Sequence, residues 1–187
     1  MRLFIAIDLP SVEKNRIGAA IAPMRTAAQT VTWVPDERLH LTMKFLGEQS
    51  DDRASAVEQA LNGVAARHRQ MELVLGGLGA FPNLRQPRVV WMAVARDPRL
   101  ELLHHDIEEA CAALGHEVDG RAFRPHITLA RVRDRLPAPA ARALATAARS
   151  VSYGASIMAD TVDLMVSEPG ARGPRYRRLS AAPLKEE

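Results

Sequence analysis

One short pattern constrains this chain of 187 residues more than any other: His-x-Thr inside an apolar, strand-forming run, present twice. The first copy is HLTMKFLG at 40–47, and the second is HITLARVR at 126–133. In a β-strand, residues i and i+2 point to the same face of the sheet. Each copy therefore predicts a strand that buries apolar side chains on one face and presents an imidazole and a hydroxyl on the other.

The segments around the two copies alternate between strand-like and helix-like patterns. Apolar or β-branched runs predict strands at 2–9, 31–34, 39–46, 71–81, 88–95, 123–132, 150–159, 161–168 and 175–182. Helices are expected from 10 to 24, from 50 to about 68, from 98 to 114 and from 137 to 148. Helices between strands, together with several strand–turn–strand joins, favour an α+β fold with largely antiparallel sheets.

We expect a single bilobal domain over residues 1–187. The two His-x-Thr strands fall at comparable places in the two halves of the chain, which suggests an internal duplication. No low-complexity linker divides the halves, so the two lobes are expected to pack together, each with a sheet and flanking helices. A chain of this size buries about 70% of its unfolded surface, which is enough for such a core.

Cysteine content and hydropathy exclude several classes of protein. The single cysteine, Cys111, excludes an internal disulfide framework and a Cys-based zinc site, and its helical spacing with Leu103 and Ile107 predicts a buried position. The opening run MRLFIAIDLP is too short for a signal peptide, and no stretch approaches the roughly 20 apolar residues of a membrane span. We therefore expect a cytoplasmic, monomeric enzyme or binding module with no membrane partner.

The paired histidines and threonines suggest a chemistry. If the two lobes face each other, the two pairs line opposite walls of one cleft: His40 with Thr42, and His126 with Thr128. Near neutral pH one imidazole can be neutral and the other protonated, which suits concerted general base and general acid catalysis. The hydroxyls can donate hydrogen bonds to anionic oxygens. Cleavage of a phosphodiester needs these groups, and the net charge of +3 is compatible with a phosphate-bearing ligand.

The residues alone leave a structural role for both pairs open, because His-x-Thr on a strand also occurs without function. A metal site is not expected. No HExxH motif or carboxylate cluster accompanies the histidines, and the run 104–106, His-His-Asp, lies on a predicted helix where adjacent side chains diverge.

The flanks of the two copies resemble a known family. WVPDERLHLTMKFLG and FRPHITLARV are similar to the paired motifs of the 2H phosphoesterases, and more closely to those of bacterial RNA 2′,3′-cyclic phosphodiesterases, historically called 2′-5′ RNA ligases. MRLFIAIDLP, FPNLRQPRVVWMAV and LMVSEPGARGPRYRRL extend the resemblance to nearly the whole chain. The resemblance implies a bilobal α+β fold with a pseudo-twofold axis and a cleft between two antiparallel sheets.

The same resemblance implies a reaction: hydrolysis of a 2′,3′-cyclic phosphate to a 2′-phosphate, with the ribose 3′ oxygen as leaving group and without metal or organic cofactor. The substrate is then an RNA with a 2′,3′-cyclic phosphate terminus, or a cyclic nucleotide. Carried over by position, His40 and His126 are the acid–base pair, and Thr42 and Thr128 hold the phosphate. Our provisional split makes His126 the base and His40 the acid, although the near-symmetry of the site also allows the reverse.

Two other functions stay open at this point. A 2′-5′ RNA ligase would use the same cleft in reverse. A non-catalytic RNA-binding module needs a basic groove and aromatic platforms. This function is less favoured, because the chain has only 4 Phe, 2 Tyr and 2 Trp and a net charge of +3.

Two basic residues follow the threonines. The resemblance gives Arg131 a phosphate or ribose role, but strict alternation points it away from His126 unless the strand ends or bulges after Leu129. Lys44 shares parity with His40 and is expected either to contact the phosphate or to be solvated.

Weaker candidates lie around these positions. Phe45 and Phe123 are expected in the core more often than as base-stacking platforms, and Phe123, beside the second motif, is the better stacking candidate of the two. Tyr176 and Ser167, in the closing segment, are expected at the rim of the site. Four arginines could bind flanking RNA phosphates or be solvated: Arg85, Arg88, Arg121 and Arg124. Two histidines, His68 and His116, are expected at the surface.

Overall fold

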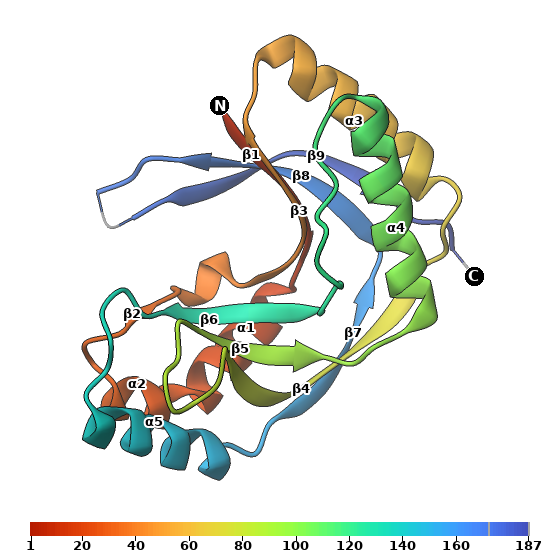
Figure 1. The fold of residues 1–187 in the computed structure, drawn as a ribbon. Coiled ribbons are helices and arrows are strands. Elements are labelled where there is room, and N and C mark those ends of the chain that lie inside the picture. The colour runs from red at the N-terminus through yellow and green to blue at the C-terminus, as the bar shows by residue number, and fades with distance from the viewer. Residues whose placement is uncertain (172, 187) are drawn as a thin grey trace.

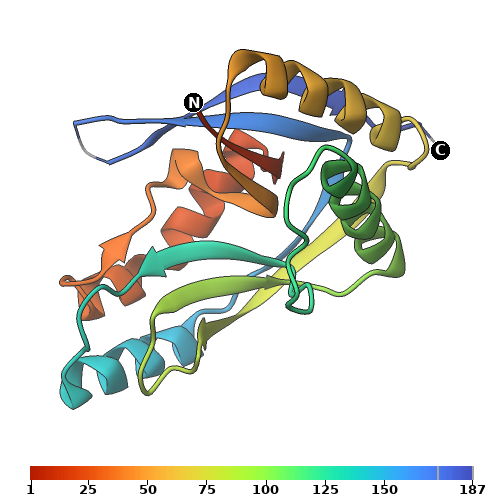
Figure 2. The same ribbon diagram turned by 45° about the horizontal axis from the view of Figure 1, so that its top comes forward.

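The described residues, 1–171 and 173–186, form one nine-stranded antiparallel sheet in this computed structural model. The sheet curls into a half-barrel with the helices outside it (Figure 1, Figure 2). The strands are β1 Arg2–Asp8, β2 Thr32–Trp33, β3 His40–Glu48, β4 Met71–Phe81, β5 Val89–Val94, β6 His126–Arg131, β7 Gly154–Ala159, β8 Thr161–Glu168 and β9 Arg175–Pro183. The helices are α1 Ser11–Ala20, α2 Ala22–Ala27, η1 Asp36–Arg38 (a 3₁₀ turn), α3 Asp51–Ala65, α4 Pro98–Ala113 and α5 Ala138–Ser150.

The strand order brings the two His-x-Thr strands together. The order is β7-β4-β5-β6-β3-β1-β8-β9, with β2 also paired to β6, so β6 and β3 are neighbours at the centre. The α+β class, the antiparallel strands and the flanking helices are confirmed. The two expected sheets are joined into one, through the single register pair Leu41–Ile127. The pseudo-twofold relation between the halves stays a prediction.

The convex face of the central strands forms the core beneath the helices. Ile5, Leu41, Val90 and Ile127 are each at most 1% exposed. Burial of one such side chain stabilises the fold by about 1.5–3 kcal/mol. α3 and α4 pack together over β3, β8 and β9, and α2 and α5 pack together beside β4. These four helices therefore lie outside the curled sheet (Figure 1).

Several local signals act as expected. Ser50 caps α3 by accepting a hydrogen bond from the Arg53 amide at 3.4 Å. Gly115 follows α4 with a φ of 85°, a conformation that favours glycine. Cys111 is buried, and burial raises the pKa of its thiol to about 11.

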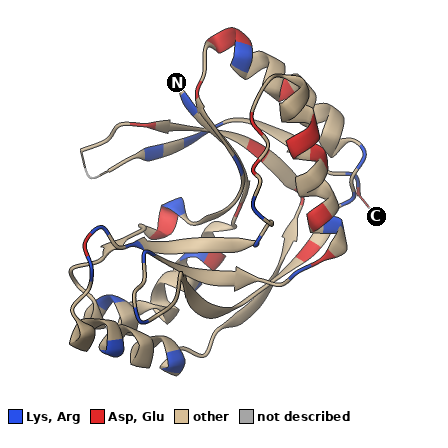
Figure 3. Ribbon diagram, viewed as in Figure 1, with Lys and Arg blue, Asp and Glu red and all other residues tan. Residues whose placement is uncertain are grey.

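Acidic residues gather along α3 and α4, and basic residues lie on α5 (Figure 3). His68, expected at the surface, is buried in the turn after α3, and its Nε2 lies 2.8 Å from Asp106 Oδ2 on α4. The surface prediction for His68 was therefore wrong, because the sequence does not show that α3 packs against α4. None of the helices in the described ranges has the length and hydropathy needed to cross a bilayer.

Candidate active site

A β-bulge reverses the side-chain alternation inside the first motif. The register of β3 with β1 shifts between Thr42 and Lys44, so Met43 is an extra residue on β3. Beyond it, Lys44 turns to the convex side and is 6% exposed, while Phe45 turns to the concave side and is 65% exposed. The expectations for these two residues were wrong: Lys44 neither faces the phosphate nor is solvated, and Phe45 is not a core residue.

The second motif carries a bulge at the same place. The register of β6 with β5 shifts between Thr128 and Ala130, so Leu129 is the extra residue. Arg131 is thereby turned to the face of His126, as it must be to take part in the site. Burial is the largest cause of the lowered pKa of His40 on the neighbouring strand, and the positive charge of Arg131 acts in the same direction.

The register between β3 and β6 brings the four motif side chains together. Leu41 and Ile127 pair across the strands with their side chains buried on the convex side. Their neighbours therefore point to the concave face: His40, Thr42, His126 and Thr128. Extending this antiparallel register places each histidine opposite the other strand's threonine and makes the histidines diagonal neighbours. The Cα atoms of such neighbours in a regular antiparallel pair are about 7–8 Å apart.

The two imidazoles are held in the same way. Nδ1 of His40 lies 2.7 Å from the carbonyl oxygen of Arg38, and Nδ1 of His126 lies 2.6 Å from that of Arg124. A carbonyl oxygen only accepts, so Nδ1 carries the proton in both rings. In a neutral ring, Nε2 then has a free lone pair and can take a proton.

His40 sits in the more enclosed half of the site. The Thr42 hydroxyl lies 2.9 Å from its Nε2, and the rings of Phe4 and Tyr176 lie 5.0 and 5.3 Å from the imidazole centroid. Burial is the largest influence on the pKa of His40 and lowers it, and Asp8 acts in the opposite direction. The neutral ring is therefore favoured at pH 7, and the Thr42 hydroxyl donates to it.

Aromatic rings also surround His126. The ring of Phe81 lies 5.1 Å from the imidazole, edge to face, and that of Trp91 lies 6.5 Å away. Of the aromatic residues beside the two histidines, sequence reasoning found Tyr176 and missed Phe4, Phe81 and Trp91. Phe4 and Trp91 come from strands paired with β3 and β6, and Phe81 ends β4, which is paired with β5, so only the strand order and register could have identified them.

Phe123 is not an open platform. Its half-buried ring stacks on His104 of α4, with centroids 3.9 Å apart and planes 10° apart. This packing agrees with the core position expected first for Phe123, because the loop before β6 turns the ring toward the helix, and a base-stacking role stays a prediction.

The remaining rim candidates divide into two groups. The Arg124 guanidinium lies 6.0 Å over the ring of Phe81, and Ser167 pairs with Tyr176, so both lie beside the site. Arg88 donates to the Arg133 carbonyl at 2.7 Å. Arg121 pairs with Asp119 at 3.1 Å, and the backbone amide of Arg85 is bound by Asn83. Contacts of any of these with RNA stay predictions.

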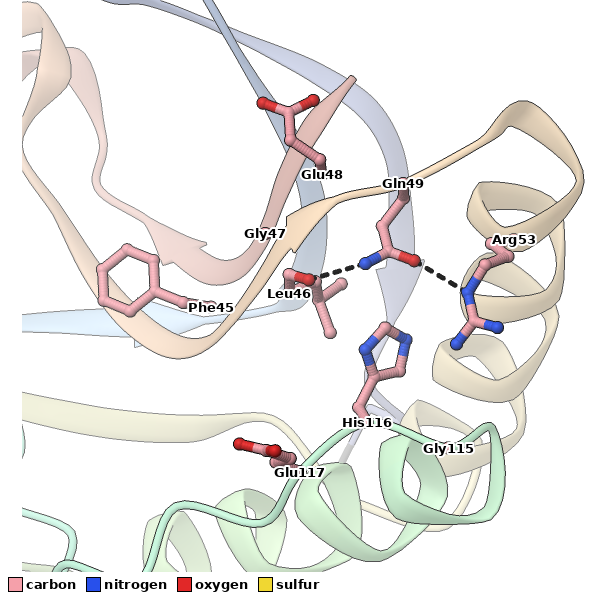
Figure 4. A pocket seen from close by; sticks show the side chains of 9 residues that line it. All are labelled: Phe45, Leu46, Gly47, Glu48, Gln49, Arg53, Gly115, His116 and Glu117. Carbon is pink, nitrogen blue, oxygen red and sulfur yellow. Dashed lines mark hydrogen bonds between the residues drawn. The ribbon is translucent and has the colours of Figure 1, made fainter.

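Two hollows adjoin the motif strands. A pocket of about 130 Å³ lies beside His40 and is lined by Asp8, Lys14, Glu37, Arg38, Met165, Tyr176 and Arg178. A larger pocket of about 510 Å³ lies between the end of β3 and the loop after α4, with Phe45 on one side and His116 on the other (Figure 4). The Nε2 atom of His116 is buried there without a hydrogen-bond partner among the described residues. In the same described ranges, no three His, Cys, Asp or Glu residues are grouped to hold a metal.

A family comparison identifies this arrangement. The model of the 2′-5′ RNA ligase superfamily matches residues 13–171 of the chain. The chain belongs to the 2′-5′ RNA ligase superfamily. Its two His-x-Thr strands, both bulges and Arg131 all lie within the matched residues.

Two relatives with similar sequences share the name RNA 2′,3′-cyclic phosphodiesterase. A protein of Aeropyrum pernix called RNA 2′,3′-cyclic phosphodiesterase is 32% identical over 89% of the chain and 89% of its own length. One of the same name from Geobacillus stearothermophilus is 37% identical over 68% of the chain, and the match spans 41% of that longer protein. The crystal structure of E. coli LigT complexed with 3′-AMP is 32% identical, with a TM-score of 0.71, over 98% of the chain and 97% of LigT.

Proposed function

We propose that this superfamily member hydrolyses RNA 2′,3′-cyclic phosphate ends to 2′-phosphates by acid–base catalysis with two histidines. One observation carries the proposal: two imidazoles with the same Nδ1 tautomer point to one concave face, beside two threonine hydroxyls and Arg131. The names of the relatives and the 3′-AMP complex of LigT support it. Cytoplasmic location and a monomeric state stay predictions.

The chemistry requires only these side chains. One neutral imidazole removes a proton from water at Nε2 as the water oxygen bonds to phosphorus. The bond from phosphorus to the 3′ oxygen breaks, and the other imidazole, protonated, donates its proton to that oxygen. The threonine hydroxyls and the Arg131 guanidinium stabilise charge on the non-bridging oxygens. All proton transfers pass through the two rings, so we propose that the reaction proceeds without a metal ion.

The division of roles is a separate question. The sequence-based split makes His126 the base and His40 the acid. The lowered pKa of His40 favours the reverse split in the ligand-free protein, because it favours a neutral ring. A bound phosphate anion opposes this effect, since it stabilises the imidazolium.

A substrate with an activated leaving group separates the two assignments. The p-nitrophenyl ester of uridine 5′-phosphate has no hydroxyl next to its phosphate group, so water must be the nucleophile. Its p-nitrophenolate leaves without needing a proton, so turnover tolerates loss of the general acid but not of the general base. Under the sequence-based split, His40→Ala keeps turnover of this substrate and His126→Ala loses it. The opposite pattern makes His40 the base.

The main test uses a short RNA that ends in a 2′,3′-cyclic phosphate, incubated in EDTA and followed by phosphorus NMR. We expect a 2′-phosphomonoester with the wild-type protein and with His105→Ala, a matched control at an exposed histidine on α4. We expect no product with His126→Ala. An intact cyclic end, a 3′-phosphate product or a requirement for added metal would each contradict the proposal.

Ligation is the second candidate, because the superfamily description names it and the same groups run in reverse. The test adds an RNA with a 5′-hydroxyl end and looks for a 2′-5′ phosphodiester. A non-catalytic RNA-binding function predicts instead a steep loss of affinity with salt, whereas a site for one or two phosphates predicts a shallow slope.

A further inference from the structure

The loop from Leu114 to Pro125 contains, near its end, the backbone carbonyl that binds the imidazole of His126. It joins α4 to β6, runs beside the sheet and has no regular secondary structure (Figure 1). Its carbonyl oxygen at Arg124 accepts the hydrogen bond from Nδ1 of His126 at 2.6 Å. An irregular segment owes its path to contacts with its neighbours. The contacts that hold this loop therefore also decide where that carbonyl lies.

One buried ion pair holds the loop at two points. Lys44 Nζ lies 2.6 Å from Glu108 Oε2 on α4, and the two side chains are 4% and 7% exposed. Lys44 Nζ also donates to the carbonyl oxygen of Glu117 at 2.8 Å. The same Glu108 oxygen accepts from the backbone amide of Asp119 at 3.3 Å. Lysine and glutamate thus bind one carbonyl and one amide, two residues apart in the loop.

A second anchor lies on the same side. Phe123 stacks on His104, and Nε2 of His104 lies 3.8 Å from the other Glu108 oxygen. The loop is therefore attached to β3 and α4 from Glu117 to Phe123, immediately before Arg124. Gly115, His116 and Glu117 of this attached loop also form a wall of the larger pocket (Figure 4).

A role in stability alone does not account for this pair. Replacing a buried ion pair by apolar residues of similar volume is often neutral or stabilising, whereas removing one partner is costly. An apolar pair could not bind the two backbone groups of the loop. Lys44 reaches them because the bulge at Met43 turns it away from the cleft.

We propose that Lys44 and Glu108 are positioning residues for His126: they tie the strand of the first motif to the loop that fixes the imidazole of the second. The inference rests on the proposed function for its kinetic consequence. Its structural consequence, the Nδ1 tautomer of His126, can be measured without any activity.

The test is the double variant Lys44→Met/Glu108→Met, which removes both charges at similar volume. A single substitution leaves a buried charge unpaired and puts the fold at risk. We expect a cooperative thermal transition, a fall in kcat of about 10–100-fold and little change in KM, because the histidine is misplaced rather than the substrate lost. Nitrogen-15 NMR of His126 should show loss of the uniform Nδ1–H tautomer, while His40 keeps its own.

The matched control is Arg96→Met/Glu101→Met, which removes an exposed ion pair at the start of α4 and should change neither measurement. A folded Lys44→Met/Glu108→Met protein with wild-type kcat and an unchanged His126 tautomer would overturn the inference. If the wild-type protein hydrolyses no cyclic phosphate, the proposed function fails, and the NMR measurement still decides the positioning role.

Discussion

The two halves of the site share a backbone design and differ in their chemistry. In each, a histidine donates from Nδ1 to the carbonyl two residues earlier, and a bulge follows the threonine. His40 is enclosed by Phe4 and Tyr176 and bonded by Thr42. His126 has no hydrogen bond to Nε2 among the described residues. The same main-chain arrangement therefore supports one imidazole whose Nε2 is already hydrogen-bonded and one whose Nε2 is left open.

The residues after the bulges differ as well. On the concave face the first motif has the exposed Phe45 and the second has Arg131. On the convex face the first has Lys44, paired with Glu108, and the second has Ala130. One half thus supplies an exposed apolar ring and the other a cation, and we predict that the first binds a base and the second a phosphate.

Removing either histidine should have the largest effect. We expect His40→Ala and His126→Ala each to lower kcat by at least about 10²–10⁴-fold, and the double variant to be little worse than either, because the pair acts as a unit. Both rings lie outside the core, so circular dichroism should show a folded protein. A folded variant of either histidine with near wild-type turnover would remove the paired mechanism.

Arg131→Met should come next. Loss of one group that stabilises transition-state charge costs about 10²–10³-fold in kcat. Arg142→Met, on the exposed side of α5, is the matched control and should keep full activity. Steady-state kinetics of both variants measures the change in kcat. An unchanged kcat for Arg131→Met would mean that Arg131 is a surface residue without a role in the reaction.

Phe45→Ala should affect binding rather than turnover. Stacking of a base on an aromatic ring contributes about 1–3 kcal/mol, so KM should rise about 5–100-fold with kcat nearly constant. Val74→Ala, another exposed apolar residue, is the control and should leave KM unchanged. If Phe45→Ala lowered kcat and left KM unchanged, the proposed division between the two motifs would be incorrect.

The pH dependence of stability should show the smallest effect. Burial lowers the pKa of His40 in the folded chain below 6.5, so the unfolded chain binds its proton first as the pH falls. Stability should therefore decline from about pH 6.5 down to the folded pKa, by about 1.4 kcal/mol per unit of pKa difference. Urea unfolding at pH 7.5 and 5.5 should show a smaller decline for His40→Gln than for the wild type or His105→Gln. Equal declines would mean that the pKa is not lowered.

The sequence predicts elements well where the signal is local. The strand over 71–81 and the helix from Pro98 match the structure, and so do the cap at Ser50 and the glycine after α4. The His and Thr of each motif share a face because they precede the bulge. Up to the bulge, successive side chains alternate between the two faces of the sheet, so the sequence pattern alone predicts their orientation.

The errors lie beyond the bulges and between distant segments. Lys44 and Phe45 exchanged faces because a bulge depends on the register with the partner strand, which no local pattern reveals. The orientation of His68 depends on Asp106, which lies far away in the sequence on α4. The orientation of Arg131 toward the face of His126 was predicted only under the condition that the strand bulges, which the register of β6 with β5 confirms, and its phosphate or ribose role stays a prediction.

The seam between the halves has a mechanical consequence. β3 and β6 share one register pair, whereas β1 and β8 share five. The sheet thus has its fewest paired residues where the two motifs meet, so ladder hydrogen bonds constrain the spacing of the imidazoles less than they constrain other neighbouring strands. A force that pulls the two halves apart should therefore separate β3 from β6 before any other pair of neighbouring strands. The two strands that carry the histidines can thus move relative to each other more easily than strands within either half.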